Sequence, residues 1–105
     1  MRILFDQGTP VPLRPLLVGH TVDTAYERGW STLTNGDLLN AAEAASYEVF
    51  ITTDQKIPRQ QSLAGRRLAI LVLPTTRWPE IQRHTAAVIA AVASVQPGEC
   101  RELTW

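Results

Sequence analysis

The chain has 105 residues and a formal net charge of zero, because ten Lys and Arg side chains balance ten Asp and Glu side chains. This length suits a single domain over residues 1–105, and the neutral balance argues against a protein that coats nucleic acid through bulk positive charge. No apolar run approaches the ~20 residues of a membrane span, and the start, MRILFDQ, is unlike a signal peptide. The lone cysteine, Cys100, excludes an intrachain disulfide and a cysteine-based zinc site. We therefore expect a cytoplasmic protein.

The net charge is the sum of unlike segments. Residues 1–54 contain three Arg and seven acidic residues (−4), residues 55–83 contain six basic residues and one Glu (+5), and residues 84–105 contain one Arg and two Glu (−1). All four Asp lie in the first segment, and nine of the ten basic residues are Arg. A neutral total is therefore compatible with a local acidic site beside a basic segment.

The first half of the chain alternates short apolar runs with helical patterns. Residues 3–5 predict a buried strand, and residues 11–18, rich in proline, predict a short helix that ends at Gly19. Residues 21–25 predict a second strand. Residues 37–46 have apolar side chains at helical spacing and predict a helix, with Thr34 or Asn35 as its N-cap.

The second half continues the same alternation. Residues 49–53 predict a third strand, and the stretch from Pro58 to Ser62 predicts a loop or a short helical turn. Residues 68–73, apolar throughout, predict a fourth strand. Residues 79–95 predict the last helix, and residues 100–105 are expected to add an edge strand.

This order of elements predicts an α/β fold. Strands that alternate with helices favour a mainly parallel sheet between two helical layers, a small doubly wound three-layer arrangement. Right-handed crossovers favour the strand order 2-1-3-4. In such sheets ligands bind at the carboxyl ends of the strands, where the chain direction reverses between strands 1 and 3.

Three aspartates fall at that edge. Asp6 ends the first predicted strand, Asp54 ends the third, and Asp37 begins the intervening helix. Converging carboxylates repel one another unless a positive charge lies between them, and Mg²⁺ or Mn²⁺ prefers such oxygen ligands. A cation there can promote hydrolysis of a phosphodiester. Thr52 and Thr53 are expected to orient the carboxylates through hydrogen bonds.

Four motifs in order resemble the small bacterial PIN-like domains. They are I-L-F-D-Q-G-T-P at 3–10, G-H-T-V-D-T-A at 19–25, N-G-D-L-L-N-A-A at 35–42 and V-F-I-T-T-D-Q-K-I at 49–57. The resemblance covers residues 1 to about 74, with a weaker match in the last helix. It implies a magnesium- or manganese-dependent endoribonuclease of toxin type, with Asp6, Asp37 and Asp54 as metal-binding and catalytic residues. RNA, an antitoxin protein and a second copy of the chain are the partners that it implies.

Two positions depart from the pattern of that family. Gln7 stands where the family usually has Glu, and Lys56 stands where it usually has a second Asp. Gln7 is assigned with the two threonines to the support of the carboxylates. Lys56 either takes over part of the cation's electrostatic role, which would weaken cation binding, or contacts a substrate phosphate together with Arg59. The alternative to a nuclease is a catalytically silent PIN-like module that binds a partner protein or RNA.

Structural roles compete with these assignments. Asp6 and Asp54 can serve as caps after strands, and Asp37 can belong to a capping box with Thr34. A phosphoacceptor domain is disfavoured, because it needs an acid in place of Gln7 and a Lys after a late strand.

Basic and aromatic side chains also allow either a functional or a structural role. The Arg residues after the third predicted strand could form a basic rim beside the acidic site; these are Arg59, Arg66, Arg67 and Arg77. Trp30 and Trp78 either stack on a nucleobase or pack within the protein, and packing is favoured.

Overall fold

The computed structural model describes all 105 residues and contains one five-stranded sheet in the order β2-β1-β3-β4-β5, with every pairing parallel. The strands are β1 (Arg2–Phe5), β2 (Thr21–Thr24), β3 (Val49–Thr52), β4 (Ala69–Val72) and β5 (Cys100–Glu102). The helices are the 3₁₀ helix η1 (Val11–Leu16) and the α-helices α1 (Asn35–Ala44), α2 (Ile57–Gln60), α3 (Trp78–Arg83) and α4 (Thr85–Ser94). The doubly wound fold and the order 2-1-3-4 are confirmed, and the tail adds β5 beside β4.

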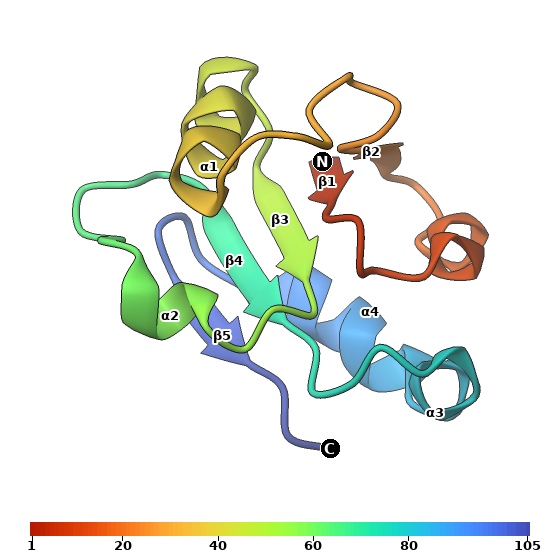
Figure 1. Cartoon of the computed structure of the whole chain (residues 1–105). Helices are drawn as coiled ribbons and strands as arrows, with labels where there is room; N and C mark the ends of the chain where they lie inside the picture. Colours follow the sequence, from red (N-terminus) through yellow and green to blue (C-terminus); the bar gives the residue numbers. More distant parts are fainter.

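Helices cover both faces of the sheet (Figure 1). The helices α1 and α2 pack on one face, where Leu39 and Ile57 meet Phe50 of the central strand. On the other face, η1, α3 and α4 pack against Phe5 and Ile51. This is the three-layer arrangement that the sequence predicts. No helix is long and apolar enough to cross a bilayer.

The apolar runs explain why β3 and β4 occupy the interior of the sheet. All four residues of each strand are buried, and successive side chains point to opposite faces. Phe50 therefore packs in one core cluster and Ile51 in the other. By contrast, β2 alternates exposed and buried positions, as expected for a strand with a neighbour on one side only.

Two helices differ from the sequence prediction. The prolines of η1 leave too few N–H donors for a regular α-helix, so the segment forms a 3₁₀ helix that ends at Leu16. The predicted helix over residues 79–95 is divided at His84, whose backbone (φ −114°, ψ 23°) leaves the helical region. The His84 ring stacks on Trp105 at 4.8 Å between centroids, so the break lies where the C-terminal segment packs.

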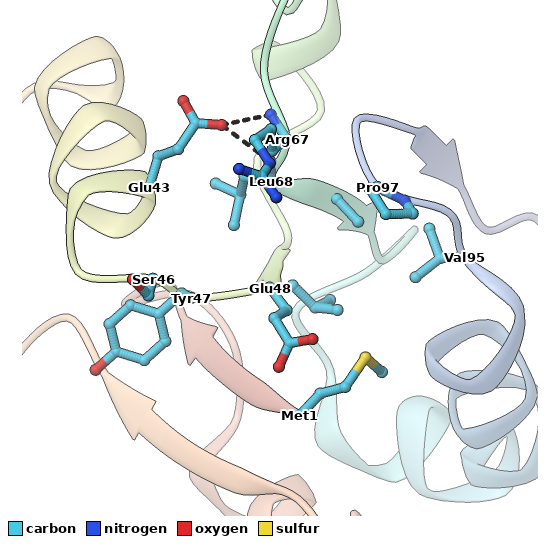
Figure 2. A pocket seen from close by; sticks show the side chains of 11 residues that line it. Met1, Glu43, Ser46, Tyr47, Glu48, Arg67, Leu68, Val95 and Pro97 are labelled. Carbon is cyan, nitrogen blue, oxygen red and sulfur yellow. Dashed lines mark hydrogen bonds between the residues drawn. The ribbon is translucent and has the colours of Figure 1, made fainter.

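At the amino edge of the sheet, Glu43 ties α1 to the start of β4. Figure 2 shows its side chain reaching toward the backbone of Arg67 and Leu68. One carboxylate oxygen accepts the N–H groups of Arg67 at 2.5 Å and Leu68 at 3.0 Å, and the other lies 3.5 Å from the Arg66 guanidinium. The N–H group of Leu68 is the main cause that lowers the pKa of Glu43, against the opposing effect of burial.

We predict that Glu43→Gln lowers the free energy of unfolding by about 1–2 kcal/mol at pH 7, because the backbone donors lose a charged acceptor. Since the folded-state pKa lies below the unfolded one, this stabilisation is present above the unfolded pKa and is lost as the pH falls through the folded one. Urea unfolding at pH 7 and below about pH 4 measures the difference. Glu102→Gln, at an exposed position whose carboxylate makes no hydrogen bond, is the control. A loss that is equal at both pH values would contradict the assignment.

Candidate active site

The carboxyl ends of β1 and β3 lie side by side and bring Asp6 next to the residues that follow β3. Phe5 pairs with Ile51 in the parallel register, and the Asp6 N–H still donates to the Ile51 carbonyl at 3.0 Å. The Thr9 hydroxyl donates to the same carbonyl at 2.9 Å. Asp6 is therefore fixed to the end of β3 by the sheet itself.

The buried Thr52 hydroxyl links the two aspartates. It donates to Asp6 Oδ2 at 2.6 Å and accepts the backbone N–H of Asp54 at 3.0 Å. The Thr52 side chain is fully buried, so these bonds are shielded from competing water. The predicted role of Thr52 in orienting a carboxylate is thus present in the geometry.

Asp54 is held from two directions. Its Oδ1 accepts the N–H of Lys56 at 2.9 Å, and its Oδ2 accepts the side-chain amide of Asn35 at 3.0 Å. Asn35 is the first residue of α1, so this bond brings the start of that helix to the site. The sequence pattern predicts only a helix-capping role for Asn35. Its position two residues before Asp37, in the motif N-G-D, is the sequence feature that could have indicated a place at the site.

Asp37 is not joined to the other two aspartates. It is exposed in the first turn of α1, where its N–H donates to the Thr34 hydroxyl. Its carboxylate makes no hydrogen bond, and no three His, Cys, Asp or Glu side chains lie close enough together to hold a metal ion. The capping of Asp37 by Thr34 is present, and a third carboxylate ligand from Asp37 stays a prediction.

Gln7 and Thr53 contribute differently from the prediction. The Gln7 backbone N–H donates to Asp6 Oδ1 at 2.6 Å, whereas its side chain is exposed and makes no hydrogen bond. Thr53 makes no hydrogen bond to either carboxylate. Its hydroxyl instead occupies the space that a Cβ on Gly8 would need. A Cβ at Gly8 would force the Thr53 side chain to shift, so the glycine lets the turn after β1 approach the end of β3 closely.

The basic segment is divided between the two edges of the sheet. Lys56 and Arg59 lie just after Asp54, at the carboxyl edge; Lys56 is exposed and forms no ion pair, and one Arg59 nitrogen donates to the Gln55 carbonyl at 2.9 Å. Arg66 and Arg67 precede β4 and therefore lie at the amino edge, beside Glu43. They cannot form a rim with the aspartates.

Two tryptophans considered for base stacking pack within the protein. Trp30 contacts Tyr47 edge-on at 6.2 Å between centroids and carries Arg28 over its face. Trp78 packs against the core on the side of α3 and α4. Packing, the favoured interpretation, is confirmed for both.

Two pockets lie at opposite edges. One, of about 350 Å³, lies at the amino ends of the strands and is lined by Met1, Glu43, Glu48 and neighbours (Figure 2). Of the residues that the sequence analysis singles out, only Arg67 lines it, and neither Asp6 nor Asp54 does. The other, of about 410 Å³, opens beside Asp6 and Gln7, between η1 and the turn after β2. Only this second pocket adjoins the aspartates.

Asp6 and Asp54 offer carboxylate oxygens, the ligand type that a hard divalent cation prefers. Each of the four carboxylate oxygens accepts one hydrogen bond and keeps further lone-pair capacity. Mg²⁺ is commonly bound by one or two carboxylates and several waters, so two aspartates suffice in number. The supporting Thr52 hydroxyl and Asn35 amide are the kind of partners that orient metal ligands.

Comparison of the chain with protein-family models, with curated proteins and with solved structures finds no match. The four motifs and the geometry of the carboxyl edge are therefore the features that bear on function.

We predict that Thr52→Val lowers the free energy of unfolding by about 1–3 kcal/mol, because the Asp54 N–H and the Asp6 carboxylate both lose their partner. Thr52→Ser keeps the hydroxyl and is expected to cost about 1 kcal/mol or less. Urea denaturation followed by circular dichroism gives both values. A valine variant as stable as the wild type would show that the hydroxyl bridge contributes nothing to stability.

Proposed function

We propose that the chain is a PIN-like endoribonuclease that depends on Mg²⁺ or Mn²⁺ and whose site is built on Asp6 and Asp54. The observation that carries the proposal is the Asp6–Thr52–Asp54 arrangement at the carboxyl ends of two neighbouring central strands. Ligands of doubly wound sheets bind at this place. The motifs that resemble PIN-like domains support the same function, including the role of a toxin with an antitoxin protein as partner and a second copy in a homodimer.

In this proposal the residues at the carboxyl edge of the sheet have three different roles. Asp6 and Asp54 bind the cation, and Thr52 and Asn35 hold their carboxylates in place. A divalent cation supplies positive charge beside the phosphodiester and lowers the pKa of water near it. The Lys56 ammonium, which forms no ion pair within the protein, is free to contact a substrate phosphate as a point charge.

A second candidate is a catalytically silent module that binds RNA or a partner protein. Gln7 and Lys56 favour it, because they replace two acidic positions of the family pattern. The exposure of Asp37 favours it as well, since its carboxylate makes no hydrogen bond and no group of three metal-ligating side chains gathers at the edge.

The test compares cation binding and RNA cleavage in aspartate variants. We expect Asp6→Asn and Asp54→Asn each to weaken Mn²⁺ binding by at least about tenfold and cleavage of single-stranded RNA by about a hundredfold or more. Asp37→Asn is the matched control and is expected to change binding by less than about twofold, because its carboxylate contacts neither aspartate. Isothermal titration calorimetry and a fluorogenic RNA substrate provide the two readouts.

The outcomes separate the candidates. Absence of Mn²⁺ and Mg²⁺ binding at millimolar concentration would reject the nuclease and leave the silent module. Cleavage that persists in Asp54→Asn would come from a contaminant or from another site. An effect of Asp37→Asn as large as that of Asp54→Asn would restore the three-aspartate site.

We also predict that Lys56→Asp raises the affinity for Mn²⁺ by about tenfold, because a positive charge near Asp54 is replaced by a negative one. Calorimetric titration of wild type and variant measures the change. Lys56→Gln, which only removes the charge, is expected to give a smaller gain. If neither variant binds Mn²⁺ more tightly than the wild type, Lys56 does not weaken the cation site.

A further inference from the structure

The pocket beside Asp6 takes no part in cation binding in the proposed nuclease. It lies between the end of β1, the helix η1 and the turn after β2, and it is lined by Asp6, Gln7, Thr9, Val11, Arg14, Thr24, Tyr26 and Glu27. Its volume of about 410 Å³ is within the range of pockets that hold small ligands. Because Asp6 belongs to both the pocket and the aspartate pair, whatever enters the pocket lies next to the proposed cleavage site.

Tyr26 presents an unoccupied aromatic face at this pocket. Its side chain is 76% exposed, and its ring makes no aromatic or cation–π contact, whereas Arg28 lies over Trp30 and Arg2 lies over Tyr47. The turn that carries Tyr26 is held firmly, since the Gly29 N–H donates to the Tyr26 carbonyl at 3.0 Å. An exposed aromatic ring on a hydrogen-bonded turn is a stacking surface for a planar group.

The charges of the pocket disfavour a phosphate inside it. Arg14 is the only cation of the lining, and Glu27 already pairs with both of its terminal nitrogens, at 2.8 and 3.1 Å. The hydrogen bond from Arg14 is the main cause that lowers the pKa of Glu27, so this carboxylate stays charged at neutral pH. With Asp6 added, the lining carries two negative charges and one positive one. A neutral planar group therefore suits the pocket better than an anion.

Polar groups around the ring can recognise the edge of such a group. The Gln7 side chain is exposed and unbonded, and its amide offers both a donor and an acceptor. The Arg14 guanidinium is already paired with Glu27, and its Nε–H is buried, so it offers no contact to a ligand. An aromatic face with the donor and the acceptor of one exposed amide in the same pocket matches the chemistry of a nucleobase.

We propose that this pocket receives an unpaired base of single-stranded RNA, stacked on Tyr26 with its edge toward Gln7. The inference rests on the proposed ribonuclease function, which places the scissile phosphate at Asp6 and Asp54. The neighbouring phosphates then lie outside the pocket, where Lys56 and Arg59 provide positive charge. Since the base must leave any duplex to enter, paired RNA is a poor ligand for this site.

The test measures RNA binding without cleavage. A short fluorescein-labelled oligouridine and a labelled oligoadenosine are titrated with protein in EDTA, and fluorescence anisotropy gives the dissociation constants. We expect Tyr26→Ala to weaken binding by about tenfold, in line with the loss of one base–aromatic stack. Tyr26→Phe keeps the ring and is expected to stay within about twofold of the wild type. Ile89→Ala, an exposed apolar truncation on α4, is the matched control and should leave binding unchanged.

Two more readouts locate the effect. Uridine and adenosine added to ¹⁵N-labelled protein are expected to shift the amide resonances of Gln7, Tyr26 and Glu27 in the wild type and not in Tyr26→Ala. A fully paired RNA hairpin is expected to bind at least about tenfold more weakly than the single strands. Because Tyr26 is exposed, Tyr26→Ala should keep the circular dichroism spectrum and melting temperature of the wild type.

Failure of this proposal is distinguishable from failure of the nuclease. If Tyr26→Ala binds and cleaves RNA like the wild type, while Asp54→Asn abolishes cleavage, the pocket is overturned and the nuclease stands. If RNA binding depends on Tyr26 but no cation supports cleavage, the pocket is supported and the nuclease fails. Equal affinity for hairpin and single strand, or no RNA binding by the wild type, would overturn the pocket.

Discussion

The parallel pairing of β1 with β3 is the constraint on which the candidate site depends. It places the residues after two strands, far apart in sequence, at one point of the sheet edge, and the buried Thr52 hydroxyl then joins Asp6 to the backbone of Asp54. The apolar strands and the helices on both faces make that register unique, since a slip by one residue would turn every side chain to the wrong face. The geometry of the aspartates is therefore a consequence of core packing.

Most of the fold follows from sequence pattern because its elements are strongly marked. Continuous apolar runs identify β3 and β4, and alternation with helices fixes a parallel sheet. The break at His84 was missed because the helical spacing of apolar residues continues across it. At the break, the His84 ring stacks on Trp105, 21 residues later in the chain, and periodicity carries no information about such contacts.

The site was predictable in part for the same reason. Asp6 and Asp54 directly follow two neighbouring strands, so the sheet topology brings them together. Asp37 lies on a helix, and the sequence pattern does not determine how that helix is rotated about its own axis. The amide of Asn35 donates to the Asp54 carboxylate, a contact that no strand pattern predicts. The basic charge of residues 55–83 suggests a basic rim beside the aspartates, to which Arg66 and Arg67 do not belong. Both follow Asp54 in sequence, but they precede β4 and therefore lie at the opposite edge of the sheet.

The hydroxyl bridge also bears on how the molecule acquires its site. The bond from Thr52 to Asp6 joins residues 46 positions apart. Such a contact requires a long loop to close, which costs chain entropy before the contact contributes any stabilisation. Local segments such as α1 can form earlier, but they carry only Asn35 and Asp37. The aspartate pair therefore exists only in molecules whose two central strands have already paired.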